Sequence, residues 1–252
     1  MAIGYACLNI GTPNTNIRSV MQRNATAEKL TEVITHNLEA LEKMVDYNIA
    51  NGIRLYRISS DLIPFGSSPV NMLDWPETHK EVFDRIGTKL RRGSMRVSFH
   101  PGQYTVLNSP TEDVVARAIE DLIYHDKILT ALGTDATNKI VLHVGGIYGD
   151  KEAALDRFAE NFQRLPESVQ NRLIIENDDR LYNSEEVLEL TNRLQIPSVF
   201  DNLHHAINPP PSGGDDRYWI AAAAKTWKAR DGKQKIHYSQ QAPGKRPGAH
   251  TD

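Results

Sequence analysis

Hydrophobic residues along the chain follow two alternating patterns. Short apolar runs between turn-forming residues predict β-strands, and they cover residues 3–8, 53–58, 95–99, 140–142, 173–175, 197–200 and 234–238. Segments whose apolar residues recur every three or four positions predict helices over residues 26–50, 112–132, 150–165 and 184–194. Ser184 is the predicted N-cap of the last helix, because Glu185 and Glu186 follow it. This repeated alternation indicates a parallel sheet with helices packed outside it.

Metal-capable residues stand at the ends of the predicted strands. His100, His143, Glu176 and Asp201 each follow an apolar run directly, and His237 lies in the last one. Because the carboxyl ends of parallel strands meet at one rim, these side chains are expected to converge there. Imidazoles mixed with carboxylates suit Zn²⁺, Mn²⁺ or Fe²⁺ better than Ca²⁺ or Mg²⁺. The pattern therefore predicts a divalent metal site.

The candidate ligands outnumber what one ion needs, so we expect Glu176 and Asp201 to bridge neighbouring ions. Three groupings are expected: His100 and His143 with Glu176, His237 with Glu176 and Asp201, and His204 with His250. The remaining histidines, His36, His79 and His125, lie in helical stretches and are expected to be hydrogen-bonded structural residues. His205 adjoins His204, and either role is open to it.

Two folds contain a parallel sheet with outer helices: an open doubly wound sheet and a closed (β/α)₈ barrel. No GxGxxG sequence follows the first strand, which removes the main support for a dinucleotide-binding sheet. Polar residues at the ends of many strands favour the barrel, whose active sites lie at that rim. We therefore predict an α/β fold, a single TIM-barrel catalytic domain over residues 1–252. Seven strands are counted, so the barrel is expected to lack its eighth strand because the chain ends early.

Composition narrows the function only slightly. The formal net charge of −3 gives no general sign of a nucleic-acid-binding protein. One segment, residues 225–246, is strongly basic: it holds seven Lys or Arg against one acid, Asp231, and forms either a solvated surface or a phosphate-facing strip. Cys7, the single cysteine, lies in the first apolar run and is expected to be buried. No signal peptide and no stretch of about 20 apolar residues is found, so we expect a cytoplasmic protein without a membrane partner.

Several short motifs carry a resemblance to a known family. They are GYACLN at 4–9, YRISSDLIPF at 56–65, HPGQY at 100–104, LHVGG at 142–146, IENDD at 175–179, DNLHH at 201–205 and KIH at 235–237. In these motifs the chain resembles the UV damage endonucleases, metal-dependent DNA repair enzymes related to endonuclease IV. The resemblance implies a TIM barrel with three divalent ions, Mn²⁺ most often and Zn²⁺ as an alternative. It also implies nicking on the 5′ side of UV photoproducts in double-stranded DNA, leaving a 3′-hydroxyl and a 5′-phosphate, with no obligate protein partner.

The resemblance also implies roles for individual residues. The ligands are His100, His143, Glu176, Asp201, His204, His237 and His250, and the catalytic residues are Lys235, Glu176 and Asp201. Lys235 matches a lysine that is carboxylated in relatives, although an ordinary lysine contacting a phosphate is the alternative. Gln103 and Tyr104 match a pair that probes the duplex at the lesion, and Tyr5 and Asn9 match residues near the damaged dinucleotide. Cys7, between these two, is expected to face the other way by strand alternation.

One departure from the family pattern is expected to matter. The family places a further glutamate ligand on an eighth strand, beyond Asp252. We therefore expect weaker occupancy of the ion shared by Glu176, Asp201 and His237, and low or absent activity. The alternatives are an endonuclease IV-like enzyme acting on abasic sites, a sugar isomerase or epimerase on the same barrel, and an inactive protein that binds damaged DNA. The basic segment and HPGQY argue against the sugar enzyme.

Overall fold

The computed structural model describes residues 2–249, which form two compact units. The first contains the chain up to Gly102 together with Glu120–Ile140, and the second contains Gln103–Ile119 and the chain from Val141 onward. In the described residues, seven strands are hydrogen-bonded in the order of the chain, β1 to β7. The ladders joining β1 to β2, β2 to β3, β3 to β4, β5 to β6 and β6 to β7 are all parallel.

Each predicted strand is confirmed, most of them in a shorter form. The strands are β1 Gly4–Ala6, β2 Leu55–Arg57, β3 Arg96–Phe99, β4 Lys139–Leu142, β5 Leu173–Glu176, β6 Ser198–Asp201 and β7 Ile236–His237. Glu176 and Asp201 are the last residues of their strands. The strands β4, β5 and β6 are buried throughout, as expected for a parallel sheet covered on both faces.

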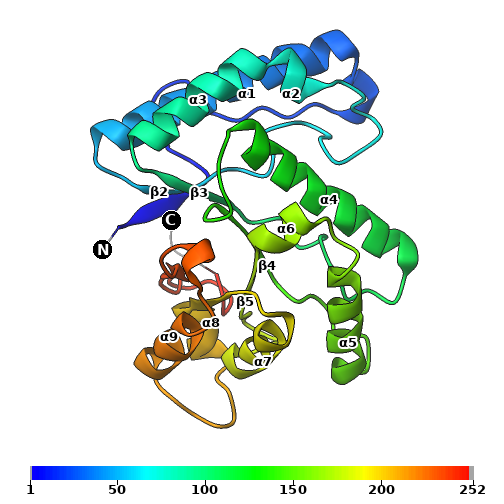
Figure 1. Cartoon of the computed structure of the whole chain (residues 1–252), viewed down its shortest axis with the longest axis vertical. Coiled ribbons are helices and arrows are strands. Elements are labelled where there is room, and N and C mark those ends of the chain that lie inside the picture. The colour runs from blue at the N-terminus through cyan, green and yellow to red at the C-terminus, as the bar shows by residue number, and fades with distance from the viewer. Residues whose placement is uncertain (1, 250–252) are drawn as a thin grey trace. The chain divides into compact units, whose positions relative to one another are not determined.

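In the first unit, two long helices pack side by side (Figure 1). Helix α1 spans Ala27–Ala50, and the Thr26 hydroxyl caps it by accepting from the Lys29 amide. Helix α3 spans Lys80–Arg92, after the short α2 at Trp75–Thr78, and a 3₁₀ turn, η1, covers Gln22–Asn24. Helix α3 was not predicted, although Phe83, Ile86 and Leu90 bury one face of it.

Helices predicted for the later part of the chain are confirmed within a few residues. They are α4 Glu112–Ala131, α5 Lys151–Phe162 and α7 Ser184–Leu194. Unpredicted short elements are α6 Glu167–Arg172, α8 Asn202–Ile207, α9 Asp216–Ala224 and the 3₁₀ turn η2 Ala229–Asp231. The predicted N-cap of α7 is wrong: Asn183 caps the helix, and Ser184 is its first residue. The Ser184 hydroxyl instead contacts His205 Nδ1, at 3.2 Å.

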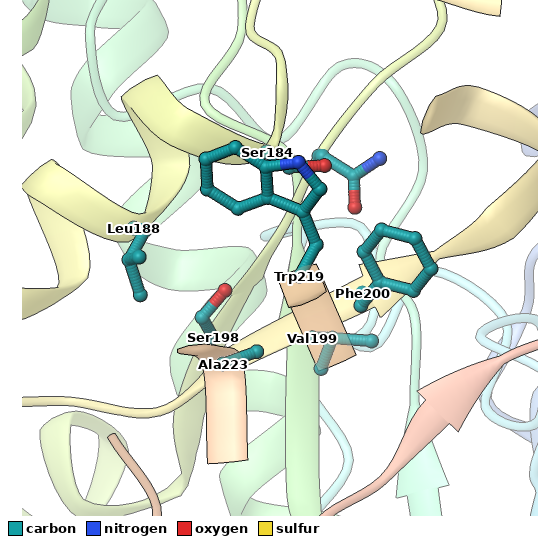
Figure 2. A pocket seen from close by; sticks show the side chains of 8 residues that line it. Ser184, Leu188, Ser198, Val199, Phe200, Trp219 and Ala223 are labelled. Atoms are coloured by element: carbon teal, nitrogen blue, oxygen red, sulfur yellow. The ribbon is translucent and has the colours of Figure 1, made fainter. Parts of the chain in front are cut away.

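In the second unit, α7 and α9 pack against β6 (Figure 1). Figure 2 shows a small cavity between these elements, where Phe200 of β6, Leu188 of α7 and Trp219 of α9 face the same space. The side chain of Asn177, just after β5, also lines it. An aromatic and aliphatic layer therefore supports the end of the sheet from which the candidate site residues project.

The environment predicted for Cys7 is wrong. Strand β1 ends at Ala6, and Cys7 has a φ of +60°, in the left-handed region that breaks strand alternation. Its side chain is partly exposed rather than buried. Tyr5 and Asn9 therefore do not belong to one continuous strand with Cys7 between them.

No helix among the described residues is long and apolar enough to cross a membrane.

Candidate metal centre

Two buried carboxylates end neighbouring strands in the second unit. Glu176 ends β5 and Asp201 ends β6, and each residue is 1 % exposed. Parallel pairing of Ile175 with Ser198 and of Glu176 with Val199 brings these two strand ends together. Glu176, Asp201 and His204 each offer one ligand atom, and these three atoms lie within 4.8 Å of one another. This group could hold a metal ion.

Two further histidines contact Glu176, one from β7 and one from just after β4. His237 Nδ1, on β7, lies 2.5 Å from Glu176 Oε1. His143 follows β4, and its Nε2 lies 3.8 Å from Glu176 Oε2. The rings of His143 and His204 are also neighbours, with centroids 5.5 Å apart. The structure thus brings together five of the ligands predicted from the sequence: His143, Glu176, Asp201, His204 and His237.

The electrostatics of this cluster suit a cation. The pKa of Asp201 is raised to about 6, mainly by burial and next by the charge of Glu176, against the lowering effect of His204. Two carboxylates buried together repel each other, and a bound divalent ion would be the strongest local charge to offset that repulsion. The imidazole and carboxylate donors also match the preferences of Mn²⁺, Fe²⁺ and Zn²⁺. The residues present therefore fit a divalent metal.

Local sequence fixes the position of His204. Asp201 is the N-cap of α8, and its Oδ1 accepts from the backbone amide of His204, at 2.9 Å. The same aspartate therefore starts the helix that carries the histidine, which explains the spacing of three residues. His204 Nδ1 donates to the backbone carbonyl of Asn177, at 2.9 Å.

Asn177 is a site residue that the sequence did not reveal. Its side-chain amide bonds both backbone groups of Asp201: Oδ1 accepts from the Asp201 N–H at 2.9 Å, and Nδ2 donates to its C=O at 3.1 Å. Asn177 is 1 % exposed. An asparagine directly after a strand-end acid was the available signal, but asparagine at that position also indicates an ordinary turn.

The other two predicted ligands are His100 and His250. His100 follows β3 in the first unit, where its backbone carbonyl accepts from the Ser60 hydroxyl at 3.2 Å. Ser60 Oγ also contacts His125 Nε2, at 3.0 Å. His250 lies outside the described residues.

The remaining histidines are hydrogen-bonded structural residues, as predicted for three of them. His36 contacts the Asn16 carbonyl, His79 contacts Thr35, and His125 contacts Asp121 and Ser60. His79 lies between α2 and α3 rather than inside a helix. The ambiguous His205 belongs to this class as well, because it is buried against Phe200 and Trp219.

The residues expected to contact DNA occupy two places. Gln103 and Tyr104 form an exposed turn at the start of the second unit, with Tyr104 82 % exposed. In the first unit, the Tyr5 hydroxyl lies beside the side-chain amides of Asn9 and Asn48, and burial raises the pKa of Tyr5. The structure therefore brings Tyr5 and Asn9 together and exposes the Gln103–Tyr104 turn.

The basic segment 225–246 is not one continuous strip. Lys225, Lys228, Arg230 and Lys233 precede β7, and Lys228 and Arg230 bond Gln195, which lies before the start of β6. Lys245 and Arg246 follow β7 in an exposed turn, and nearby Gly248 packs against Asp179, just after β5. The two groups therefore belong to opposite ends of the parallel strands. Lys235, partly buried, directly precedes β7.

Fold and cluster together define a class: a (β/α)₈-type protein with a candidate divalent metal centre at the carboxyl ends of its strands. The family model described as UV-endonuclease UvdE matches residues 2–252. The UV DNA damage endonuclease of Clostridium perfringens (strain 13 / Type A) is 41% identical over 256 residues, covering 100% of this chain. The crystal structure of SacUVDE superposes with a TM-score of 0.94 at 36% identity, covering 99% of this chain and 84% of that one. The chain belongs to the UV-endonuclease UvdE family.

Two further comparisons concern the length of the chain and its fold. The chain spans 61% of the length of the C. perfringens relative. Endonuclease IV from Thermus thermophilus has a TM-score of 0.52 at 15% identity, covering 74% of this chain and 66% of that one. At that identity the likeness shows the fold alone, and it agrees with the predicted barrel class.

Proposed function

We propose that this protein is a metal-dependent DNA repair endonuclease that acts in the cytoplasm and nicks double-stranded DNA 5′ to UV photoproducts. The proposed products are a 3′-hydroxyl and a 5′-phosphate. The observation that supports it most is the buried Glu176–Asp201 pair with three histidines around it, in a chain of the UvdE family. Burying two carboxylates beside each other lowers the stability of the folded protein, so a cation-binding role accounts for their position.

The proposed site holds three divalent ions, Mn²⁺ preferred and Zn²⁺ possible. When bound, such ions would supply Lewis acidity, neutralising charge on the phosphodiester and making water a better nucleophile. The ligand set we propose is His100, His143, Glu176, Asp201, His204, His237 and His250. Glu176, whose two oxygens face different histidines, and Asp201 are the proposed bridges. Lys235 is proposed as a further catalytic residue, through its carboxylated form.

Recognition of the lesion is assigned to exposed and half-buried side chains. Tyr104 is proposed to stack where damaged bases leave the helix, because an aromatic ring can replace lost base stacking. Gln103 beside it can hydrogen-bond base edges, and Tyr5 with Asn9 is proposed to contact the damaged dinucleotide. A photoproduct is already poorly stacked, so displacing it costs less than displacing normal bases.

The test is cleavage of end-labelled duplexes that carry one UV photoproduct, one abasic site or no damage, in Mn²⁺ and in EDTA. We expect Mn²⁺-dependent nicking 5′ to the photoproduct, with a 3′ end that a DNA polymerase extends. Glu176→Gln should lower the rate by at least about 100-fold, because loss of outer-shell partners alone costs 10–100-fold in metal sites. Glu160→Gln, an exposed acid on α5, is the matched control and should cleave normally.

Two results would overturn the proposal. Preferential cleavage at the abasic site would indicate an endonuclease IV-like activity. Binding to photoproduct DNA without nicking in Mn²⁺ would indicate an inactive damage-binding protein.

A further inference from the structure

The end of strand β5 makes an unusual set of contacts with its neighbours. Asn177 follows Glu176 directly, and its side-chain amide clamps the N–H and the C=O of Asp201 on β6. This clamp ties the residue that follows β5 to the last residue of β6, so the two carboxylates are held in a fixed relation. Asn177 is buried, so each hydrogen bond forms away from water and is costly to lose.

Backbone carbonyls at the same place accept from two histidines. His143 Nδ1 contacts the Glu176 carbonyl at 3.3 Å, and His204 Nδ1 contacts the Asn177 carbonyl at 2.9 Å. A carbonyl oxygen can only accept, so in each ring Nδ1 must carry the proton. In a neutral ring Nε2 then keeps the lone pair that a metal needs. The two adjacent carbonyls therefore select the same tautomer in both histidines.

We infer that Asn177 is a positioning residue for the metal centre. It does not reach the metal itself: its side chain fixes Asp201, and its carbonyl fixes the ring and tautomer of His204. The Glu176 carbonyl acts in the same way on His143. The inference rests on the proposed function, because it assigns these contacts to metal binding. Outer-shell partners of this kind orient the ligands and strengthen metal affinity.

The chain offers a matched control in the first unit. Asn37 on α1 is also fully buried, and its side-chain amide clamps the N–H and the C=O of one residue, Arg18, at 2.8 and 3.0 Å. Asn177→Leu and Asn37→Leu thus remove the same kind of clamp, one beside the acids and one on α1. Mn²⁺ affinity of both variants and of the unsubstituted protein is measured by isothermal titration calorimetry.

We expect Asn177→Leu to weaken Mn²⁺ binding by about 10–100-fold, and Asn37→Leu to leave it within about twofold. Unchanged affinity in Asn177→Leu overturns the inference, and so does an equal loss in both variants, which would indicate general destabilisation.

A second measurement needs neither a variant nor a metal. Nitrogen-15 NMR of the metal-free protein at pH 8 should show His143 and His204 with the proton on Nδ1, and an Nε2–H form of His204 overturns the inference. If the unsubstituted protein binds no Mn²⁺, the proposed function fails, and this NMR result alone decides whether the two rings are held as inferred.

Discussion

At the residue scale, the candidate site combines groups that the sequence reveals with one that it hides. A strand-end acid or histidine is visible because a hydrophobic run stops at a side chain that is hard to bury. Glu176, Asp201, His143 and His237 were found in this way, and the structure brings them together. Asn177 was missed because its role depends on the backbone of β6, which no local pattern around residue 177 encodes.

The buried acid pair predicts a conflict between stability and metal binding. Asp201→Asn removes one of two repelling charges but keeps the oxygen that caps α8. At pH 8 and without metal, we expect the melting temperature to rise by roughly several degrees, since each unit by which folding raises the pKa of a carboxyl costs about 1.4 kcal/mol in its charged form. The Mn²⁺-induced rise in melting temperature should disappear. Both are read by differential scanning calorimetry.

A cap of the same kind provides the control for this variant. Asp215 caps α9 by accepting from the Tyr218 amide, at an exposed position. Asp215→Asn should change neither the metal-free melting temperature nor the Mn²⁺ response appreciably. A metal-free melting temperature of Asp201→Asn below that of the unsubstituted protein would contradict the repulsion between Asp201 and Glu176.

At the element scale, apolar periodicity predicted the seven strands and the helices with the most regular apolar faces. Helix α3 was missed because three apolar residues, Phe83, Ile86 and Leu90, bury its face among many charged ones. Helix α8, six residues long, is too short to show a period, and it forms because Asp201 caps it. The end of β1 was misjudged because the positive φ of Cys7 has no hydrophobic signature.

The charged face of α3 predicts an acid-sensitive contact with α1. The Glu42 carboxylate accepts from Arg85 Nε and Nη2 at 2.7 and 2.8 Å, and Lys89 lies 2.9 Å away. The hydrogen bond from Arg85 is the main reason that the pKa of Glu42 is lowered to about 2. Glu42→Gln should therefore lower the free energy of unfolding at pH 7 by about 1 kcal/mol, measured by urea denaturation.

The pH dependence of this effect has a defined sign. A lowered pKa in the folded state gives stabilisation that is complete above the ordinary value of 4.5 and is lost as the pH falls toward 2. The difference between the two proteins should therefore narrow between pH 5 and pH 3. Glu32→Gln, which breaks the exposed contact with Lys29 on the same helix, should have a much smaller effect at any pH.

At the scale of the whole molecule, the fold class and the place of the site were predictable, because β-α alternation and the residue types at strand ends are both visible in the sequence. The way in which the fold divides the basic segment was not predictable. Its seven cations fall in one stretch of the sequence, but β7 divides them, so five lie before the strand and two, Lys245 and Arg246, after it. Because the net charge of the chain is −3, the proposed DNA binding depends on where such cations lie.

This division predicts which cations meet the phosphate backbone. Lys245 and Arg246 share the strand end that carries the acid cluster, so replacing both with alanine should weaken binding to a UV-irradiated duplex in EDTA. Each lost phosphate contact should reduce the slope of log affinity against log salt concentration by about 0.9, so the double variant should lose about 1.8. Replacing Lys228 and Arg230, which bond Gln195 at the opposite strand end, removes the same charge and should leave the slope unchanged. Equal slopes in the two double variants would mean that the cations act through net charge, and that the strand end does not select the face that DNA contacts.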